Sequence, residues 1–481
     1  MNGRIVDLAD DRALGGVEAW GRTHLVGIGG AGMSAVARLL LARGVEVSGS
    51  DAKGGAALDA LAALGAQVRV GHEAGAVEGA RALVVSSAVR EDNPEVVAAR
   101  QAGVPVLHRS QALAALMAGR RGVAVAGTHG KTTTSSLIAV AARAMGLDPS
   151  YAIGGDLVDG GGNAAAGAGD LFVAEADESD GSFLRYRPAV CVVTNVEPDH
   201  LDHYGTGEAV DAAFAAFALL PGPDGLLTAC ADDPGVTRLL AALPPTAPRV
   251  LTYGEGPAAQ VRVSGISVDA AGTRFEVRGL PAAPGRVLSV QLRMPGRHNA
   301  LNATAALIVL TEAGGDGDAA VAALATVGGA RRRFDLVGEA DGVRVVDDYA
   351  HHPTEVAALL SAARRVVGDG RVVAVFQPHL VSRTRAFAAE FGRALSLADA
   401  VVLMDVYAAR EVPDPDVRAG FLRPHVHLPD ADVLAVDDAD EVAARVAELA
   451  GPGDLVLTVG AGDVTTQGPR ILRALDQRSR R

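Results

Sequence analysis

Lysine and cysteine are scarce in this chain of 481 residues, and each scarcity narrows its possible functions. The two cysteines, Cys191 and Cys230, have no further cysteine at metal-ligand spacing, which argues against a cysteine metal site and fits a reducing compartment. Lysine occurs only at Lys53 and Lys131, although lysine and arginine together number 44. Because arginine so greatly outnumbers lysine, each of the two lysines is a candidate for a functional role.

Long apolar runs and basic clusters are also missing. No stretch of about eighteen apolar residues is free of charge or glycine, so we expect no membrane span. Residues 1–10 mix charges early and lack the apolar core of a secretory signal, which predicts a cytoplasmic protein. The formal net charge is −13, and a nucleic-acid binder usually carries a basic patch. We therefore expect neither a membrane nor a nucleic acid as partner.

What the chain does contain is a repeated pattern of β-branched run, glycine-bearing turn and helical segment. This pattern is typical of strand–loop–helix units in parallel sheets. We predict an α/β protein of three domains, each with a mainly parallel sheet, over residues 1–118, 119–330 and 331–481. The first and third are expected to be Rossmann-like, and the second a phosphate-loop ATPase domain. Residues 226–293 suggest short alternating strands, and the Gly- and Ala-rich residues 160–169 suggest a mobile loop.

The strongest single motif follows the strand-like residues 123–126 and precedes a helical run over residues 135–144. Backbone N–H groups at a helix N-terminus bind phosphate, with a lysine for the β- and γ-phosphates and a hydroxyl for Mg²⁺. Only two residues separate the first glycine from Gly-Lys, whereas four are usual, so a plain glycine turn is the alternative. The lysine and threonines favour an ATP site. Its predicted residues are Gly127, Thr128, His129, Gly130, Lys131, Thr132 and Thr133.

Acidic and histidine side chains follow the next predicted strands. Glu175 ends the apolar run 171–174, and His200 follows the run 190–194. Ligands bind at this edge of open parallel sheets, and magnesium prefers oxygen ligands. We predict that Thr132, Glu175 and His200 hold magnesium, although a solvated charged loop and a structural histidine are the alternatives.

The first module contains a second glycine-rich turn, residues 27–32, with Asp51 about twenty residues further on. Alone, this pattern would predict an NAD-dependent oxidoreductase or a nucleotide-sensing module. Neither explains a second phosphate loop that carries lysine. A sugar nucleotide can place its diphosphate on the same helix N-terminus. The residues predicted to bind it are Gly29, Gly30, Ala31, Gly32 and Ser34, with Asp51, Ser86 and Ser87 as weaker candidates.

Taken together, the motifs resemble those of the Mur ligase family, and they cover all three modules. They are the two glycine-rich loops, residues 175–180, 194–200, 298–302, 332–334 and 347–355, in the order seen in that family. The resemblance implies that Asn299 meets adenine, Arg333 lies near the γ-phosphate and Asp348 holds the ATP ribose. It places Tyr349, His351 and Arg383 near the incoming amino acid and the muramyl carboxylate. In the residues alone, the two histidines of segment 347–355 could equally be helix-entry residues.

The resemblance further implies the reaction. ATP would activate UDP-N-acetylmuramate as an acyl phosphate, and L-alanine would then attack it, giving ADP and phosphate in peptidoglycan precursor synthesis. Lys131, Glu175, His200 and Arg333 are the expected catalytic residues, with two magnesium ions, in a monomer or weak homodimer. Another Mur-type amino acid or peptide ligase is the alternative. Leu380 stands where an arginine is common in the family, and the shortage of lysine predicts that no carbamylated lysine holds the second magnesium.

Overall fold

The computed structural model describes residues 15–409 and 411–480 of the chain, so the expectation for residues 1–10 lies outside the described part. The chain forms two compact units. The first comprises Met1–Ser264, Glu276–Val290 and Leu301–Val327, and the second Gly265–Phe275, Gln291–Ala300 and Gly328–Arg481. Within the described residues, every helix is too short or too polar to cross a membrane.

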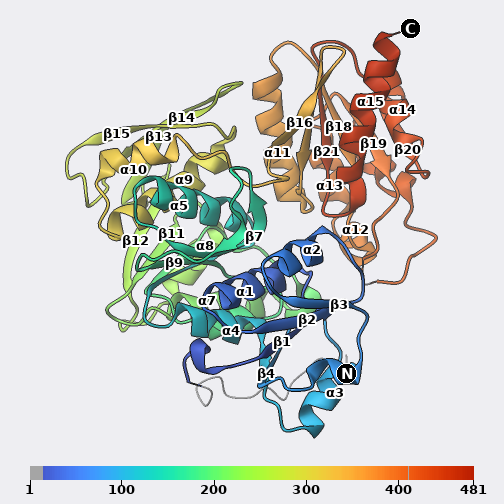
Figure 1. The fold of residues 1–481 in the computed structure, drawn as a ribbon. Coiled ribbons are helices and arrows are strands. Elements are labelled where there is room, and N and C mark those ends of the chain that lie inside the picture. Colours follow the sequence, from blue (N-terminus) through green and yellow to red (C-terminus); the bar gives the residue numbers. More distant parts are fainter. Residues whose placement is uncertain (1–14, 410, 481) are drawn as a thin grey trace. The chain divides into compact units, whose positions relative to one another are not determined.

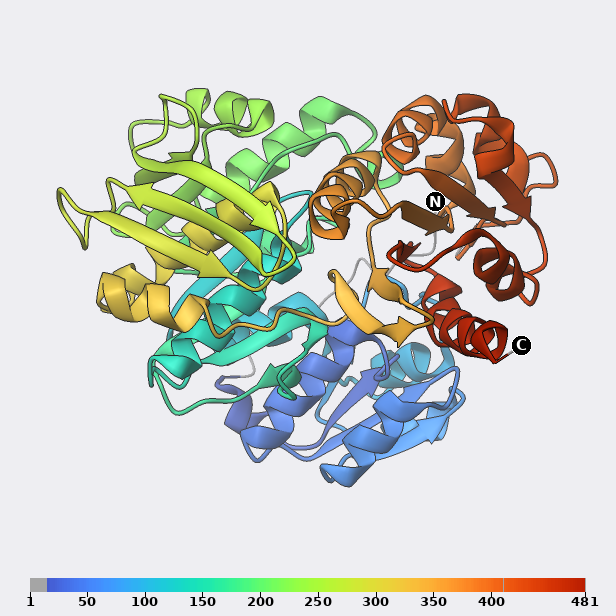
Figure 2. The ribbon, with the colours of Figure 1, turned by 90° about the horizontal axis from the view of Figure 1, so that it is seen from above.

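A parallel five-stranded sheet forms the N-terminal part of the first unit, and its strands lie side by side, in blue, in Figures 1 and 2. Alternate side chains serve opposite faces, as the period of two in a strand requires. Leu25 of the first strand packs in one core cluster with Leu39 of α1, while Val26 packs with Val96 of α3 in another. In order across the sheet the strands are β3 (Gln67–Val70), β2 (Val47–Asp51), β1 (Thr23–Val26), β4 (Ala82–Val85) and β5 (Val106–His108). The helices are α1 (Ala31–Ala42), α2 (Ala56–Ala63), α3 (Pro94–Gln101) and α4 (Arg109–Met117).

The central sheet has ten strands in the order β15-β14-β13-β12-β11-β10-β6-β9-β7-β8. Its middle is parallel and almost wholly apolar, because both faces are covered. The carboxyl ends of its middle strands carry the phosphate loop, the acidic residues and the histidine singled out above. The strands here are β6 (Arg121–Ala126), β9 (Leu171–Glu175), β10 (Val190–Val193), β11 (Leu226–Cys230) and β12 (Arg249–Gly254). Three further strands are β13 (Val261–Asp269), β14 (Gly272–Arg278) and β15 (Val287–Leu292). The helices of this part are α5 (Lys131–Ala144), α6 (Leu201–Tyr204), α7 (Gly207–Ala218), α8 (Pro234–Ala241), α9 (Arg297–Glu312) and α10 (Gly317–Leu324).

One segment differs from the sequence-based expectation. Part of the predicted mobile loop, residues 160–169, is strand β8 (Gly162–Ala165), which pairs antiparallel with β7 (Ser150–Leu157). The side chain of Asn163 is buried and donates a hydrogen bond of 2.7 Å to the carbonyl of Ala31 at the start of α1. Pairing and this tertiary contact order a segment whose glycines and alanines carry little local signal.

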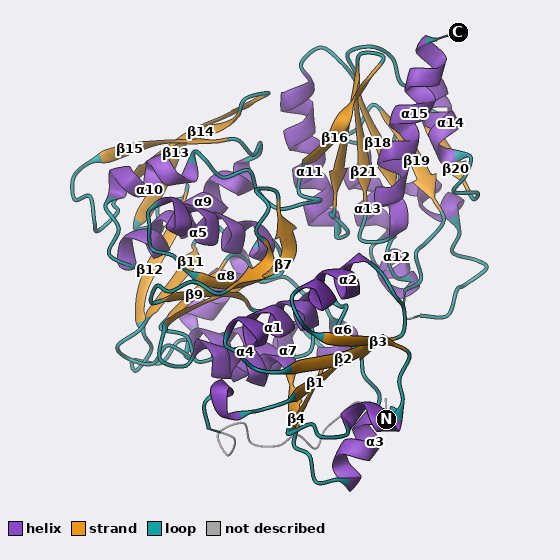
Figure 3. Ribbon diagram, in the orientation of Figure 1, coloured by secondary structure: helices purple, strands orange, loops and turns teal. Residues whose placement is uncertain are grey.

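The C-terminal sheet belongs to the second unit and has the order β16-β17-β21-β18-β19-β20. In β18, Ala374 and Phe376 pack in one core with Phe391 of α13, while Val373 and Val375 pack in another that includes Ile471 of α15. The sheet therefore carries helices on both faces, as Figure 3 shows. Its strands are β16 (Asp335–Ala340), β17 (Val343–Asp348), β18 (Val372–Phe376), β19 (Ala400–Met404), β20 (Val433–Val436) and β21 (Leu455–Val459). Its helices are α11 (Pro353–Val367), α12 (Val381–Ala386), α13 (Ala388–Leu395), α14 (Val442–Leu449) and α15 (Gln467–Ser479).

Three sheets, each mainly parallel, confirm the predicted fold class. The apolar runs read as strands from the sequence are strands in the structure. The edge strands β5, β16 and β20 were not predicted, because β5 has only three residues and because β16 and β20 are only partly buried.

Candidate active site

The phosphate loop joins the end of β6, at Ala126, to the start of α5, at Lys131. Two glycines in it have positive φ angles, +137° at Gly127 and +83° at Gly130, a region that favours glycine. A Cβ atom on Gly127 would also collide with the hydroxyl of Thr194. The sequence can make this sharp strand-to-helix turn only because glycine stands at both positions.

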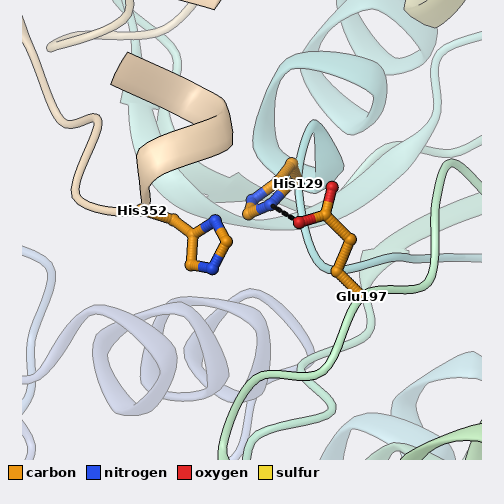
Figure 4. Close-up of side chains that lie close together, drawn as sticks. All are labelled: His129, Glu197 and His352. Atoms are coloured by element: carbon orange, nitrogen blue, oxygen red, sulfur yellow. Dashed lines mark ion pairs between the residues drawn. The ribbon is translucent and has the colours of Figure 1, made fainter. Parts of the chain in front are cut away.

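Side chains that follow β10 hold the loop in shape. Asn195 Oδ1 accepts a hydrogen bond of 2.7 Å from the backbone N–H of His129, and Thr128 Oγ1 accepts one of 2.9 Å from the N–H of Glu197. His129 Nε2 lies 3.5 Å from Glu197 Oε2, and Figure 4 shows these two side chains facing each other. Asn195 was not among the predicted site residues; it fixes the loop without itself belonging to it.

Lys131 is the cation at the centre of this region. Its Nζ donates to the carbonyls of Gly127 and Thr128, at 2.7 and 3.1 Å, and to Glu178 Oε1 at 2.8 Å. Burial opposes its charge, but the carboxylates of Glu178 and Asp177 outweigh this and raise the pKa of the Lys131 ammonium. The side chain is thus held as a cation at the N-terminus of α5, where an anion is favoured.

Glu175 lies at the carboxyl end of β9, as predicted. Its Oε1 accepts a hydrogen bond of 3.2 Å from the hydroxyl of Thr132, and its Oε2 one of 2.7 Å from the N–H of Gly154. Two of the three predicted magnesium ligands are therefore neighbours.

His200, the third predicted ligand, pairs with a residue that sequence reasoning left out. His200 Nε2 lies 3.6 Å from Glu178 Oε1 and 3.8 Å from Asp199 Oδ2. Burial disfavours its protonation, but hydrogen bonding to Glu178 and the charge of Asp199 outweigh burial and raise the pKa of His200. Glu178 is thus the common partner of Lys131 and His200. The sequence showed only an acidic run, and nothing in it marked which carboxylate faces the loop.

The donor set fits a magnesium ion. Thr132 and Glu175 supply the oxygen atoms that magnesium prefers. Glu178 Oε2 is buried and accepts no hydrogen bond from any residue that the structure describes. A buried carboxylate oxygen without a partner is costly, and a cation beside it would remove that cost.

In the first module, the glycine-rich turn between β1 and α1 is partly closed by a carboxylate. Asp51 Oδ2 accepts a hydrogen bond of 3.0 Å from the N–H of Gly29, while Ser34 Oγ donates one of 3.0 Å to the carbonyl of Ala31. Gly30 is the N-cap of α1 and has no side chain that could cap the helix. The first backbone N–H groups of α1 can therefore bind a ligand such as an anion. The candidates Ser86 and Ser87 follow β4, and Ser87 Oγ lies 3.0 Å from His108 Nε2.

The second unit contains the predicted residues from the C-terminal module. Asp348 ends β17, and its two oxygens accept hydrogen bonds of 2.8 Å from the N–H groups of Phe334 and Ala350. Burial raises the pKa of Asp348 to about 6, although the nearby Arg333 acts in the opposite direction. A carboxylate fixed in this way is well suited to accept hydrogen bonds from hydroxyl groups.

Tyr349 is the centre of a group of rings and cations in this unit. The guanidinium of Arg333 lies 5.3 Å from the centre of its ring, and the ring of His351 lies 5.3 Å from it. The His351 ring is in turn 5.9 Å from that of His379. Burial lowers the pKa of His351 to about 4, although Glu355 acts in the opposite direction. His351 is therefore neutral at pH 7 and can accept a proton at one ring nitrogen.

Arg383 and Asn299 are also buried in the second unit. Arg383 lies in α12, and this helix begins directly after Leu380. The φ angle of Leu380, +69°, is unusual for a residue with a branched side chain. Asn299 donates a hydrogen bond of 2.8 Å to the carbonyl of Pro295 near the start of α9. The structure places all the predicted residues among the described ones, and their substrate roles remain predictions.

Comparison with known proteins agrees with this architecture. Three family models match the chain: the Mur ligase family catalytic domain over residues 22–121, the Mur ligase middle domain over 125–310 and the Mur ligase glutamate ligase domain over 332–462. Similar proteins include a UDP-N-acetylmuramate–L-alanine ligase of Kineococcus radiotolerans, 59% identical over 97% of this chain and 98% of that protein. Another is the enzyme of the same name from Paenarthrobacter aurescens, 53% identical over 96% of this chain and 99% of that protein.

A solved structure gives the same answer. The UDP-N-acetylmuramate-alanine ligase of Thermotoga maritima has a TM-score of 0.79 at 28% identity, over 96% of this chain and all of that one. The chain belongs to the Mur ligase family, whose members are ATP-dependent ligases. This membership confirms the resemblance seen in the sequence, and it removes the reason for considering an NAD-dependent oxidoreductase.

Proposed function

We propose that this chain joins L-alanine to the carboxylate of UDP-N-acetylmuramate at the expense of ATP, in peptidoglycan precursor synthesis. The phosphate loop with Lys131 held as a cation by Glu178 is the observation that carries the proposal. The names of relatives that are 59% and 53% identical over nearly the whole chain supply the substrates. Another Mur-type ligase is the alternative, and the amino acid used distinguishes the two.

The proposed chemistry has two steps. An oxygen of the muramyl carboxylate attacks the γ-phosphorus of ATP, the bond to the β-phosphate oxygen breaks, and ADP leaves. The alanine ammonium group first gives up a proton to become an amine. The amine nitrogen then attacks the acyl carbon and the carbon–oxygen bond to phosphate breaks. The second proton lost by the nitrogen is taken up by the phosphate that leaves. Lys131 would neutralise charge on the transferring phosphoryl group, as cations do in phosphoryl transfer.

Magnesium, when bound, would balance the negative charge of the ATP phosphates. We propose two ions, held by Thr132, Glu175 and His200. The orphaned oxygen of Glu178 supports adding this residue to the set. Hard oxygen ligands dominate the group, as magnesium requires.

In the second unit, we propose that Arg333 approaches the γ-phosphate, that Asn299 meets adenine and that Asp348 holds the ribose hydroxyls. The two N–H bonds to Asp348 support its part, because they fix a carboxylate in place. Tyr349, His351 and Arg383 would contact the incoming alanine and the muramyl carboxylate. A neutral His351 beside Tyr349 could accept a hydrogen bond from the alanine ammonium group.

The N-terminal module would bind the UDP part of the sugar nucleotide. Its diphosphate would meet the start of α1 at Gly29, Gly30, Ala31, Gly32 and Ser34, and Asp51, Ser86 and Ser87 are weaker candidates. The remaining expectations stand as proposals: domain boundaries at residues 118 and 330, a cytoplasmic monomer or weak homodimer, and no nucleic-acid or membrane partner. The net charge of −13 supports the last of these.

An end-point assay with UDP-N-acetylmuramate, ATP, Mg²⁺ and a panel of single amino acids tests the proposal. We expect the amide product with L-alanine, and less of it with glycine or L-serine. A product formed only with another amino acid or with a peptide would support the alternative. If UDP-N-acetylmuramate is not consumed with any of them, the proposed function is wrong.

A further inference from the structure

The acidic segment, residues 175–180, contacts two different parts of the first unit. Glu175 and Glu178 contact the phosphate loop, through Thr132 and Lys131. Asp177 and Asp180 instead contact the N-terminal module. Asp177 Oδ2 accepts a hydrogen bond of 2.7 Å from Arg109 Nη2, and Asp180 Oδ2 accepts one from Ser87. The proposed function gives Asp177 and Asp180 no part, so these contacts require an explanation.

Arg109 also contacts the sugar-nucleotide turn. It is the first residue of α4, and a Cβ atom built on Gly32 would lie 2.5 Å from Arg109 Nη1. The guanidinium thus occupies the space that the missing side chain of Gly32 leaves open at the start of α1. Arg109 Nη1 therefore lies beside Gly32, a residue of the proposed diphosphate site, while Nη2 binds Asp177.

The pair is partly buried and lies near a second cation. The side chains of Arg109 and Asp177 are 20% and 36% exposed. Arg109 bonds directly to Asp177, and the charge of Lys131 also acts on it. Asp177 therefore interacts with both the cation at the sugar-nucleotide turn and the cation of the phosphate loop. Partly buried charge pairs are screened less by solvent than exposed ones.

We propose that Arg109 is a positioning residue that couples the sugar-nucleotide site to the phosphate loop through Asp177. A diphosphate at the start of α1 attracts Arg109, which remains bonded to Asp177. Binding of the sugar nucleotide then fixes the acidic segment, and with it Glu175 and Glu178. Such coupling is reciprocal, so ATP must tighten sugar-nucleotide binding by the same factor. The inference rests on the proposed function, because it takes UDP-N-acetylmuramate as the ligand.

Calorimetry on the full chain measures this coupling. The Kd of UDP-N-acetylmuramate is determined with and without a saturating non-hydrolysable ATP analogue and Mg²⁺, and the ratio of the two values is the coupling factor. For the wild-type protein we expect about fivefold or more, the low end of typical coupling. Arg109→Ala should weaken sugar-nucleotide binding and bring the ratio to about one. Arg109→Lys should restore part of the coupling, because lysine keeps the positive charge but lacks the planar guanidinium that can bind two partners at once.

Asp177→Asn separates coupling from mere structural support. Without the carboxylate, Arg109 loses its competing anion, so the Kd without nucleotide should stay the same or fall while the ratio drops to about one. A purely structural pair would weaken both measurements together. Arg43→Ala is the matched control, because Arg43 caps the opposite end of α1 and pairs with Glu18 at 2.9 Å. This variant should keep the wild-type ratio.

The outcomes are distinct. A wild-type ratio of one, or an unchanged ratio in Asp177→Asn and Arg109→Ala, would overturn the coupling while leaving the proposed function intact. If Arg109→Ala does not fold, the Asp177→Asn result decides alone. Failure of the wild-type protein to bind UDP-N-acetylmuramate would instead reject the proposed function, and the coupling with it.

Discussion

Lys131 gives the most direct test of the site. Lys131→Ala removes the charge proposed to neutralise the transferring phosphoryl group, so kcat should fall by about a hundredfold or more. The Kd of UDP-N-acetylmuramate should change little, because the contacts of Lys131 lie in the central module. Phosphate release and calorimetry measure the two quantities. Arg238→Ala, which breaks an exposed pair with Asp211, is the control, and turnover of Lys131→Ala within about threefold of wild type would refute the assignment.

The two lysines also bear on the second magnesium. A carbamate needs a neutral amine near that ion, but the raised pKa of Lys131 keeps its amine protonated, and a carbamate there would repel Glu178. Lys53 is exposed and lies in the N-terminal module. Turnover should therefore be unchanged when carbon dioxide is stripped from the buffer. Activity that falls on stripping and returns with bicarbonate would contradict this prediction.

Asp348 should make the stability of the folded chain depend on pH. Its pKa rises from 3.8 to about 6 in the folded chain, so its contribution to stability is fully present below pH 3.8 and is lost as the pH rises through about 6. His351, with its lowered pKa, acts oppositely in the same range, so only a comparison with a variant isolates Asp348. As the pH rises from 4 to 7, the Tm of Asp348→Asn should therefore increase relative to the Tm of the wild-type protein. Asp430→Asn, at a carboxylate that is 97% exposed, should show no such trend.

Elements were easier to predict than the contacts between them. The phosphate loop could be predicted because strand, glycines, lysine and helix are contiguous, and the local geometry needs each of them. Glu178 was missed as a partner of Lys131 because an acidic run does not reveal which side chain turns inward. The Arg109–Asp177 pair joins positions 68 residues apart, and no local pattern signals such a contact. Strand β8 depends on pairing with β7 and on Asn163, which lies outside any recognisable motif.

The turn between β6 and α5 offers a test at the level of the element. Gly127→Ala adds a methyl group where the hydroxyl of Thr194 already lies, at a φ angle of +137°. The loop must shift, so the rise in Tm that ATP and Mg²⁺ produce should largely disappear. Gly146→Ala is the matched control: it also has a positive φ angle, +76°, but nothing lies within 4 Å of the added atom. This control should lower Tm and still respond to ATP; equal responses in the two variants would show that the loop tolerates the methyl group.

At the scale of the whole molecule, the three modules are proposed to serve one reaction, and the fate of a single oxygen atom tests whether they do. If the muramyl carboxylate attacks the γ-phosphorus, one of its oxygens must end in inorganic phosphate when alanine displaces the acyl phosphate. UDP-N-acetylmuramate labelled with ¹⁸O in the carboxylate should therefore yield labelled phosphate together with ADP, as mass spectrometry can show. Labelled phosphate can form only if the carboxylate is activated, ATP donates the phosphoryl group and the amine displaces it, all in one catalytic cycle. Labelled AMP with pyrophosphate would mean attack at the α-phosphorus, and would remove the part proposed for Lys131 at the β- and γ-phosphates.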